Sequence, residues 1–405
     1  VTPISEHVAD VMGSPNIYRP PVEDPQWFGW QKCLENLAVP AHPYDPRLLI
    51  LAVKDYKEDM LPLFRSHLWN SARPLTDHEN INGIPGQKFI DSIKLNTSIG
   101  YPLGGPKRRF VTELEPTEDA PCNRIFDVVI MDEIDRCLVC YRKGERAYVI
   151  AKACKKDEVL SKIKCRIFYG NGIALTFLVR KYFLPILRVM QFNPKVSECA
   201  VGVNSHGPEW QELHEHIFTF GKDRLIGGDY GKYDQKLPAQ LILAALRIMI
   251  DFARECDYSE EDLRIMEAMA GDIVYAIIAF NGDLIGLTEG THISGNSLTV
   301  IINGICGSLN LRCYFYKNNP CASFEERLKF REYVKLVTYG DDNIGSVSDK
   351  INNFTIKGAS EFLGEYGQTY TMPDKESELL DFLPPEEFEF LKRKSVFHEA
   401  LGVHV

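Results

Sequence analysis

The chain has 405 residues, of which 45% are hydrophobic and 25% are charged, and it contains no low-complexity tract. This length predicts two or three packed subdomains, and the composition excludes disorder as the main state. The formal net charge of −10 does not exclude a nucleic-acid partner, because an acidic exterior can surround a basic channel.

Positive charge is concentrated in four short runs, at residues 107–109, 152–156, 162–166 and 392–394. Any single run could simply be a solvated face. We expect no transmembrane segment, because the most apolar run, 241–253, is interrupted by two charges. Eleven scattered cysteines are typical of reduced thiols. The chain begins with valine, which suggests a piece of a longer precursor or a truncated chain.

The first hundred or so residues are rich in proline and turn signals, which favours a segment that wraps over other elements rather than building its own core. Helical periodicity then predicts one helix over residues 127–142 and a second over 175–190. The apolar stretch 224–229 predicts a buried strand that ends at Asp229.

The next segment alternates helices with a hairpin. Pro238 is expected to open a helix that runs through Phe252, and Ser259 with Asp262 forms a capping pattern ahead of a helix over 263–269. Residues 273–280 and 284–287 flank an Asn-Gly pair, which predicts a β-hairpin. The apolar segment 298–314 predicts a buried helix.

A second hairpin is predicted from strands at 333–338 and 344–347, and its tip carries the adjacent acids Asp341 and Asp342. The succession of strand, helix, hairpin and helix predicts an α+β domain with an antiparallel sheet.

Two adjacent aspartates in a turn repel each other unless a cation neutralises them, although a surface turn is the alternative for Asp341 and Asp342 taken alone. Their apolar flanks and the placement of Asp229 at another strand end favour a shared site. Hard carboxylates from two strand ends suit Mg²⁺. A pair of such ions activates a hydroxyl nucleophile and neutralises a leaving pyrophosphate, so the sequence predicts nucleotidyl transfer.

Seven segments between residues 96 and 394 resemble, in the same order, the motifs of RNA-dependent RNA polymerases of positive-strand RNA viruses. The resemblance is greatest to the picorna-like viruses of invertebrates and marine protists. Three segments match almost completely: an Asp-x4-Asp at 229–234, an SGxxxTxxxN at 294–303 and the YGDD at 339–342. The others lie at 97–102, 156–168, 371–375 and 390–393.

This resemblance implies a right-hand polymerase fold of the α+β class. Fingers are expected at 1–186 and 272–291, palm at 187–271 and 292–395, and the start of a thumb, otherwise largely absent, at 396–405. The expected ion is Mg²⁺, with Mn²⁺ as a substitute, and the expected partners are an RNA template, a primer strand and ribonucleoside triphosphates. It also implies excision from a viral polyprotein, a small viral protein as an alternative primer, and membrane-associated replication sites in the host cytoplasm.

The resemblance also carries residue roles. The metal-binding acids would be Asp229, Asp341 and Asp342, and Lys375 would protonate the leaving pyrophosphate. The group that reads the ribose 2′-hydroxyl would be Asp234, Ser294, Thr299 and Asn303. Arg166 would hold the triphosphate with help from Lys156 and Lys164, although the compact Lys164-Cys-Arg166 spacing departs from the family pattern.

RNA contacts are implied at two further segments. Those at the template entry would be Thr97, Ser98, Gly100, Tyr101 and Pro102. Those at the primer would be Lys392 and Arg393.

Simpler interpretations exist for several of these residues. The motif at 294–303 could cap and line a helix start, Lys375 could be an ordinary surface lysine, and residues 392–393 could flank a turn. For the whole chain, a reverse transcriptase shares the palm and a similar turn, but Asp234 and Asn303 stand where those enzymes need a bulky aromatic residue. A non-catalytic RNA-binding protein with a retained polymerase fold is the second alternative.

Overall fold

The structure is a computed structural model of the chain, and it describes residues 5–13, 28–39, 42–118, 121–156, 166–288, 290–293 and 295–404. Its α-helices are α1 (Ser5–Met12), α2 (Phe28–Ala38), α3 (Pro46–Arg65), α4 (Asp77–Asn82), α5 (Val128–Arg142), α6 (Ile173–Phe192), α7 (Pro194–Ser197), α8 (Pro208–Ile217), α9 (Tyr233–Lys236), α10 (Ala239–Arg254), α11 (Glu260–Val274), α12 (Thr299–Asn318), α13 (Phe330–Tyr333) and α14 (Ile356–Glu365). Its strands are β1 (Val111–Glu113), β2 (Arg124–Phe126), β3 (Ile150–Lys155), β4 (Ile167–Gly170), β5 (Leu225–Gly231), β6 (Ile277–Phe280), β7 (Asp283–Gly286), β8 (Val334–Tyr339), β9 (Asp342–Val347), β10 (Thr369–Thr371), β11 (Phe397–His398) and β12 (Val403–His404).

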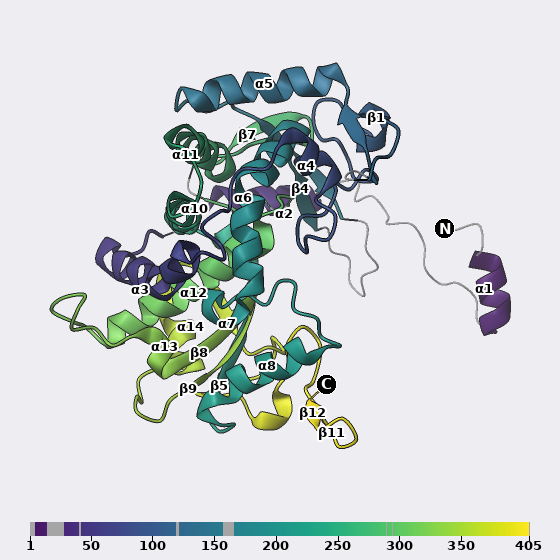
Figure 1. Cartoon of the computed structure of the whole chain (residues 1–405). Helices are drawn as coiled ribbons and strands as arrows, with labels where there is room; N and C mark the ends of the chain where they lie inside the picture. The colour runs from purple at the N-terminus through teal and green to yellow at the C-terminus, as the bar shows by residue number, and fades with distance from the viewer. Residues whose placement is uncertain are drawn as a thin grey trace.

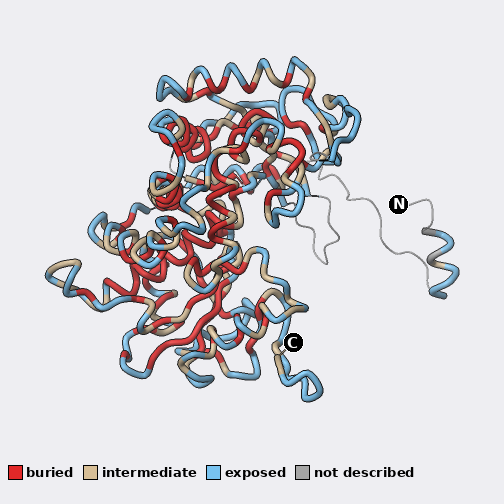
Figure 2. Tube along the Cα trace, viewed as in Figure 1, coloured by how far each residue is buried: buried red, intermediate tan, exposed pale blue. Residues whose placement is uncertain are grey.

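A four-stranded antiparallel sheet, with the order β10-β5-β9-β8, forms the lower half of the molecule in Figure 1. Helices α12 and α14 pack against it, and α8 contacts β8 and β9. Figure 2 shows its strands and α12 as mostly buried. This sheet is the antiparallel sheet that the sequence predicts, and its two central strands carry predicted acids. The predicted strand end at Asp229 is wrong, because β5 continues through Gly231 in its pairing with β10, whereas β9 does begin at Asp342.

A second sheet, with the order β4-β3-β6-β7, lies in the upper half with α5 and α11. Strands β3 and β6 run parallel, a pairing that the sequence does not predict, whereas β6 and β7 form the predicted antiparallel hairpin. The predicted hairpin strand from residue 273 is too long, because α11 continues to Val274 and β6 begins at Ile277. The continuous apolar run hides this boundary, since a buried helix end and a buried strand look alike in sequence.

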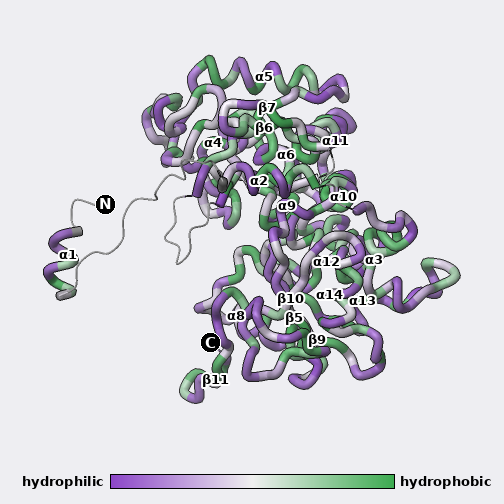
Figure 3. Tube along the Cα trace, turned by 180° about the vertical axis from the view of Figure 1, so that it is seen from behind, coloured by the Kyte–Doolittle hydropathy of each residue, from purple (hydrophilic) through white to green (hydrophobic). Residues whose placement is uncertain are grey.

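The predicted helices at 127–142, 175–190, 238–252, 263–269 and 298–314 are confirmed as α5, α6, α10, α11 and α12. Ser259 and Asp262 form a reciprocal capping box at the start of α11, as their spacing predicts. Figure 3 shows hydrophobic and hydrophilic residues alternating along α5, which is typical of a helix with one exposed face.

Helix α3 has 20 residues and was not predicted, because we took the proline-rich beginning of the chain for a wrapping segment. Pro46 occupies the first turn of α3, where its missing N–H costs nothing, and Asp45 caps the helix. Tyr56, Met60 and Phe64 are fully buried, and α3 packs against α10 and α12. The first hundred residues therefore contribute to the main core. The predicted domain boundaries stay predictions.

Candidate active site

The pairing of β5 with β9 brings the predicted acids together. Gly228 pairs with Asn343, so the next residue on β5, Asp229, lies opposite Asp342 where the pairing of the two strands ends. On the other side of β5, Asp229 pairs with Thr371 of β10. The carboxylate of Asp229 thus comes from β5, and those of Asp341 and Asp342 come from the neighbouring β8–β9 turn.

The turn between β8 and β9 consists of two residues, Gly340 and Asp341, because Tyr339 pairs directly with Asp342. Gly340 has a φ of +65°, a conformation that favours glycine. Desolvation raises the pKa of the Asp342 carboxyl, and the negative charges of Asp341 and Asp229 raise it further. A divalent cation would relieve this repulsion.

Lys375 contacts these acids directly. It has a positive φ of 67°, and its Nζ lies 2.9 Å from Oδ2 of Asp229. The Lys375 side chain is 65% exposed, so this ion pair adds little to stability. It nevertheless places an ammonium group among the carboxylates.

The acids match a magnesium site in chemical type, although in the ranges that the structure describes no three His, Cys, Asp or Glu side chains are close enough together to hold one ion. Magnesium needs only one or two protein carboxylates, because waters and substrate phosphates fill its other positions. The three mutually repelling carboxylates of β5 and the neighbouring β8–β9 turn fit this requirement.

The predicted ribose-reading residues lie beside the acids. Burial raises the pKa of Asp234, and the nearby charge of Asp341 adds to this shift. Tyr233 donates a hydrogen bond of 2.9 Å to the Asn303 carbonyl, which joins the Asp234 segment to α12. Asn303 is 8% exposed, and its Oδ1 has no hydrogen-bond partner among the described atoms. A buried acceptor of this kind is costly unless a ligand supplies a donor.

The rest of the SGxxxTxxxN motif is placed in part. Thr299 begins α12, and its hydroxyl accepts the Asn296 N–H at 3.3 Å. A Cβ atom on Gly295 would collide with the Tyr169 carbonyl of β4, so the close approach of the two segments requires glycine. Ser294 lies outside the described residues.

Arg166 lies directly before β4, and its positive charge offsets part of the burial-induced rise in the pKa of Asp234, which places the guanidinium near the ribose-reading group. The Lys156 N–H donates to the Arg166 carbonyl at 2.8 Å, so these two predicted triphosphate ligands are backbone neighbours. Lys164 lies outside the described residues.

The predicted template-entry residues form an exposed loop above the start of α6. Thr97, Ser98, Tyr101 and Pro102 are exposed, whereas Gly100 is buried with a φ of +93° against Asn171 and Gly172. Lys107, which the prediction did not include, donates to the Thr97 hydroxyl at 2.6 Å and to the Ser98 carbonyl at 2.8 Å. It holds the loop from beneath, since only 7% of it is exposed.

The predicted primer-contact residues form a tight turn in which Phe390 and Arg393 exchange two backbone hydrogen bonds of 3.0 Å. Leu391 and Lys392 both have positive φ angles, as a type I′ turn requires. The charge of Lys392 offsets a small part of the rise in the pKa of Asp342, so this lysine lies near the acids. Arg393 contacts His206 and lines a cavity of about 280 Å³ next to Tyr339.

Asn343 is a residue that the sequence reasoning missed. Its Nδ2 donates to the Gly228 carbonyl at 3.1 Å, and its Oδ1 accepts the Tyr370 hydroxyl at 2.7 Å. It therefore joins β9 to β5 and β10 directly behind Asp229. The available signal was the polar side chain of Asn343 between the two acids of the turn and the predicted strand 344–347.

Comparison with known proteins agrees with this geometry. A family model described as viral RNA-dependent RNA polymerase matches residues 44–403. The chain belongs to this polymerase family. The "Replicase polyprotein" of Drosophila C virus (strain EB) is 28% identical over 96% of the chain, and that of Cricket paralysis virus is 27% identical over 94%. The family model and these relatives together confirm the predicted resemblance to the polymerases of picorna-like viruses.

The chain spans only 23% and 22% of the length of these two polyproteins. A solved structure, "Sicinivirus 3Dpol RNA dependent RNA polymerase", superimposes with a TM-score of 0.72 at 20% identity, covering 91% of this chain and 72% of the other. This similarity confirms the right-hand fold of mixed helices and sheets. The expected absence of most of a thumb stays a prediction.

Proposed function

We propose that the chain performs template-directed RNA synthesis, in which an RNA 3′-hydroxyl attacks the α-phosphate of a ribonucleoside triphosphate. The observation that carries this proposal is that Asp229 of β5 lies beside the turn with Asp341 and Asp342, where the pairing of β5 with β9 ends. Membership of the polymerase family supports it.

Asp229 and Asp341, assisted by Asp342, would hold two Mg²⁺ ions, for which Mn²⁺ can substitute. When bound, the ions would lower the pKa of the attacking hydroxyl and neutralise the negative charge on the leaving pyrophosphate. The short β8–β9 turn and the β5–β9 register hold the carboxylates next to one another, so the role of the protein would be to orient these carboxylates toward the ions.

Recognition of the ribose would fall to Asp234, Thr299 and Asn303, together with Ser294. Asn303 contributes the unpartnered buried Oδ1, which can accept the proton of a 2′-hydroxyl. Deoxyribose would leave this acceptor unpaired, and such a loss is the usual basis of strong discrimination. A reverse transcriptase would need a bulky aromatic residue here, whereas the motif supplies the polar side chains of Asp234 and Asn303.

The triphosphate would lie between Arg166 and Lys375. Arg166 offers a planar fork for phosphate oxygens, with Lys156 and Lys164 as further cations. Lys375 already reaches Asp229 at 2.9 Å, which places its ammonium where it can give a proton to the leaving pyrophosphate.

The RNA would contact the loop of Thr97, Ser98, Gly100, Tyr101 and Pro102 as template, and the turn with Lys392 and Arg393 as primer. The polyprotein relatives support excision from a viral polyprotein and replication in the host cytoplasm. We propose in addition that replication takes place at membrane-associated sites and that a small viral protein can serve as primer. None of the described helices is long and apolar enough to cross a bilayer.

A direct test follows extension of a primed RNA template with one matched nucleotide at a time, as ribonucleotide or deoxyribonucleotide. We expect incorporation only of the templated base and a clear preference for the ribonucleotide. Asn303→Ala should reduce this preference about tenfold, the value of one lost buried hydrogen bond. Asn318→Ala, at the far end of the same helix, serves as the control. Incorporation that ignores the template would contradict the proposal.

A further inference from the structure

A buried ion cluster lies behind the strand that leads to the Asp341–Asp342 turn. It consists of Glu198, Arg312, Arg331 and Asp55, and we call it the Glu198 cluster. Both side-chain oxygens of Glu198 accept the Arg312 guanidinium, at 2.6 and 2.7 Å, and Arg312 Nε donates to Asp55 of α3 at 3.0 Å. Glu198 is 1% exposed and Arg312 is fully buried, so these charges are compensated without water.

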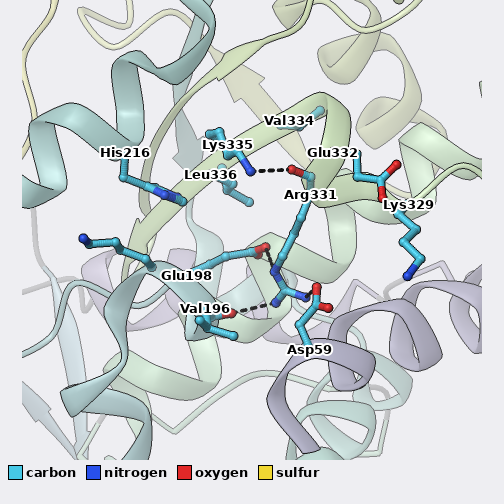
Figure 4. Close-up of a pocket in the computed structure, with 11 residues that line it drawn as sticks. Asp59, Val196, Glu198, His216, Lys329, Arg331, Glu332, Val334, Lys335 and Leu336 are labelled. Carbon is cyan, nitrogen blue, oxygen red and sulfur yellow. Dashed lines mark hydrogen bonds and ion pairs between the residues drawn. The ribbon is translucent and has the colours of Figure 1, made fainter. Parts of the chain in front are cut away.

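Arg331 adds a second cation to Glu198. Its Nε lies 2.9 Å from Glu198 Oε1, and its other nitrogens reach Asp59 at 3.1 Å and the Val196 carbonyl at 2.7 Å. Figure 4 shows Arg331 extended between Glu198 and Asp59, with Val196 alongside. Burial opposes ionisation of Glu198, but the charges of Arg312 and Arg331 outweigh it and lower its pKa to about 2. The Glu198 side chain is therefore held by cations from two helices, α12 and α13.

The contacts of the Glu198 side chain also hold its backbone in place. Glu198 follows α7 in a left-handed conformation, with a φ of +56°, and its carbonyl accepts two hydrogen bonds from one residue, Thr338. The donors are the Thr338 N–H and the Thr338 hydroxyl, each at 2.7 Å. The Ala200 N–H in turn donates to the Thr338 carbonyl at 2.9 Å. Residues 198–200 thus pair with β8 at this one point.

Thr338 is the last residue of β8 before Tyr339, after which the turn with Asp341 begins. It is 1% exposed and pairs with Asn343 on its other side. Helix α12 closes the remaining side, because a Cβ on Gly304 would lie 2.6 Å from the Thr338 hydroxyl. The root of the carboxylate turn is therefore held on three sides.

We propose that Glu198 and Thr338 are positioning residues, which fix the β8–β9 turn so that Asp341 and Asp342 meet Asp229. Neither residue touches substrate. The inference rests on the proposed metal role of the acids. It adds that the orientation of Asp341 and Asp342 depends on a contact between segments 140 residues apart in sequence.

Thr338→Val tests the inference with little change of shape, since valine keeps the branched side chain and loses only the hydroxyl. Thr338→Ser keeps the hydroxyl and should therefore retain the hydrogen bond to the Glu198 carbonyl. Thr355→Val is a matched control, because the Thr355 hydroxyl caps α14 by accepting the Gly358 N–H at 3.1 Å, in a helix away from the turn. Glu198→Gln weakens the fixation of the carbonyl from the side-chain end.

Two readouts are needed, both without RNA: the Mn²⁺ dissociation constant from calorimetry, and hydrogen exchange of the amides in residues 338–343. We expect Thr338→Val and Glu198→Gln to raise the Mn²⁺ dissociation constant about fivefold and to speed exchange in this segment. Thr338→Ser and Thr355→Val should leave both readouts within twofold of wild type. Equal loss in Thr355→Val would show a general stability effect and overturn the inference.

The two proposals can fail separately. Wild-type protein that binds no Mn²⁺ sensitive to Asp341→Asn would contradict the metal site of the proposed function. The positioning role is then decided by hydrogen exchange alone, where unchanged protection of residues 338–343 in Thr338→Val would overturn it.

Discussion

Replacing Asn343 with alanine should damage both stability and chemistry, because this side chain joins three strands behind the acids. Asn343 is 6% exposed, and it donates to the Gly228 carbonyl and accepts the Tyr370 hydroxyl. Asn343→Ala removes both hydrogen bonds inside the sheet. Gly228 directly precedes Asp229, so the loss also loosens the strand that carries one of the proposed metal ligands.

The magnitude follows from the two lost hydrogen bonds. Each buried donor or acceptor left unsatisfied costs about 1–3 kcal/mol, so Asn343→Ala should lower the unfolding free energy by about 2–4 kcal/mol. Tyr370→Phe removes one of the two bonds and should cost about 1–2 kcal/mol. The double variant should cost about 1 kcal/mol less than the sum, because both single variants break the same hydrogen bond.

Urea unfolding of the four proteins in this cycle measures these values, and single-nucleotide addition at a fixed folded fraction measures the chemistry. We expect at least a tenfold slower addition for Asn343→Ala. Asn353→Ala, which alters an exposed asparagine that donates to the Asn318 carbonyl at 3.0 Å, should change neither quantity much. Additive effects of the Asn343 and Tyr370 variants, or a loss below about 1 kcal/mol for Asn343→Ala, would refute this reasoning.

Three further predictions concern separate sites. Burial lowers the pKa of the His292 imidazole to about 4, so only the unfolded chain takes up its proton below about pH 6.5. The unfolding free energy should therefore fall by up to about 3 kcal/mol between pH 6.5 and 4, and urea titrations of His292→Gln should lack this part of the slope. Gly295→Ala should abolish nucleotide addition, because its methyl group would collide with the Tyr169 carbonyl; circular dichroism will show whether folding survives. Arg312→Met should cost about 3–5 kcal/mol in urea unfolding, since it removes the buried cation that Glu198 and Asp55 share and leaves each acid with one remaining arginine, Arg331 or Arg327; a smaller loss would show that water reaches the two acids.

Local signals predicted the acidic centre well. Asp229 lies on a buried strand and Asp341 lies in a tight turn, and each feature depends on fewer than ten consecutive residues. Only the predicted end of the strand at Asp229 is wrong, since β5 continues to Gly231. The meeting of these stretches was inferred from carboxylate chemistry, and the β5–β9 register supplies the geometry. The capping box of α11 and the apolar α12 were equally readable, because capping and periodicity depend on near neighbours.

Long-range pairing was not readable from one sequence. The parallel contact of β3 with β6 joins residues more than a hundred positions apart, and nothing local distinguishes it from an antiparallel contact. The same limit hid the roles of Glu198 and Asn343, whose partners lie on other elements. Helix α3 was missed for another reason, since its helix-starting Pro46 resembles the turn prolines around it.

The most direct test of the central claim compares wild type with Asp341→Asn in Mg²⁺-dependent addition of one ribonucleotide to a primed RNA template. Asp349→Asn, an exposed acid just beyond β9, is the matched control. The proposed function predicts addition by wild type and by Asp349→Asn, with a loss of at least a hundredfold in Asp341→Asn. Addition by Asp341→Asn at the wild-type rate would contradict the role of these carboxylates.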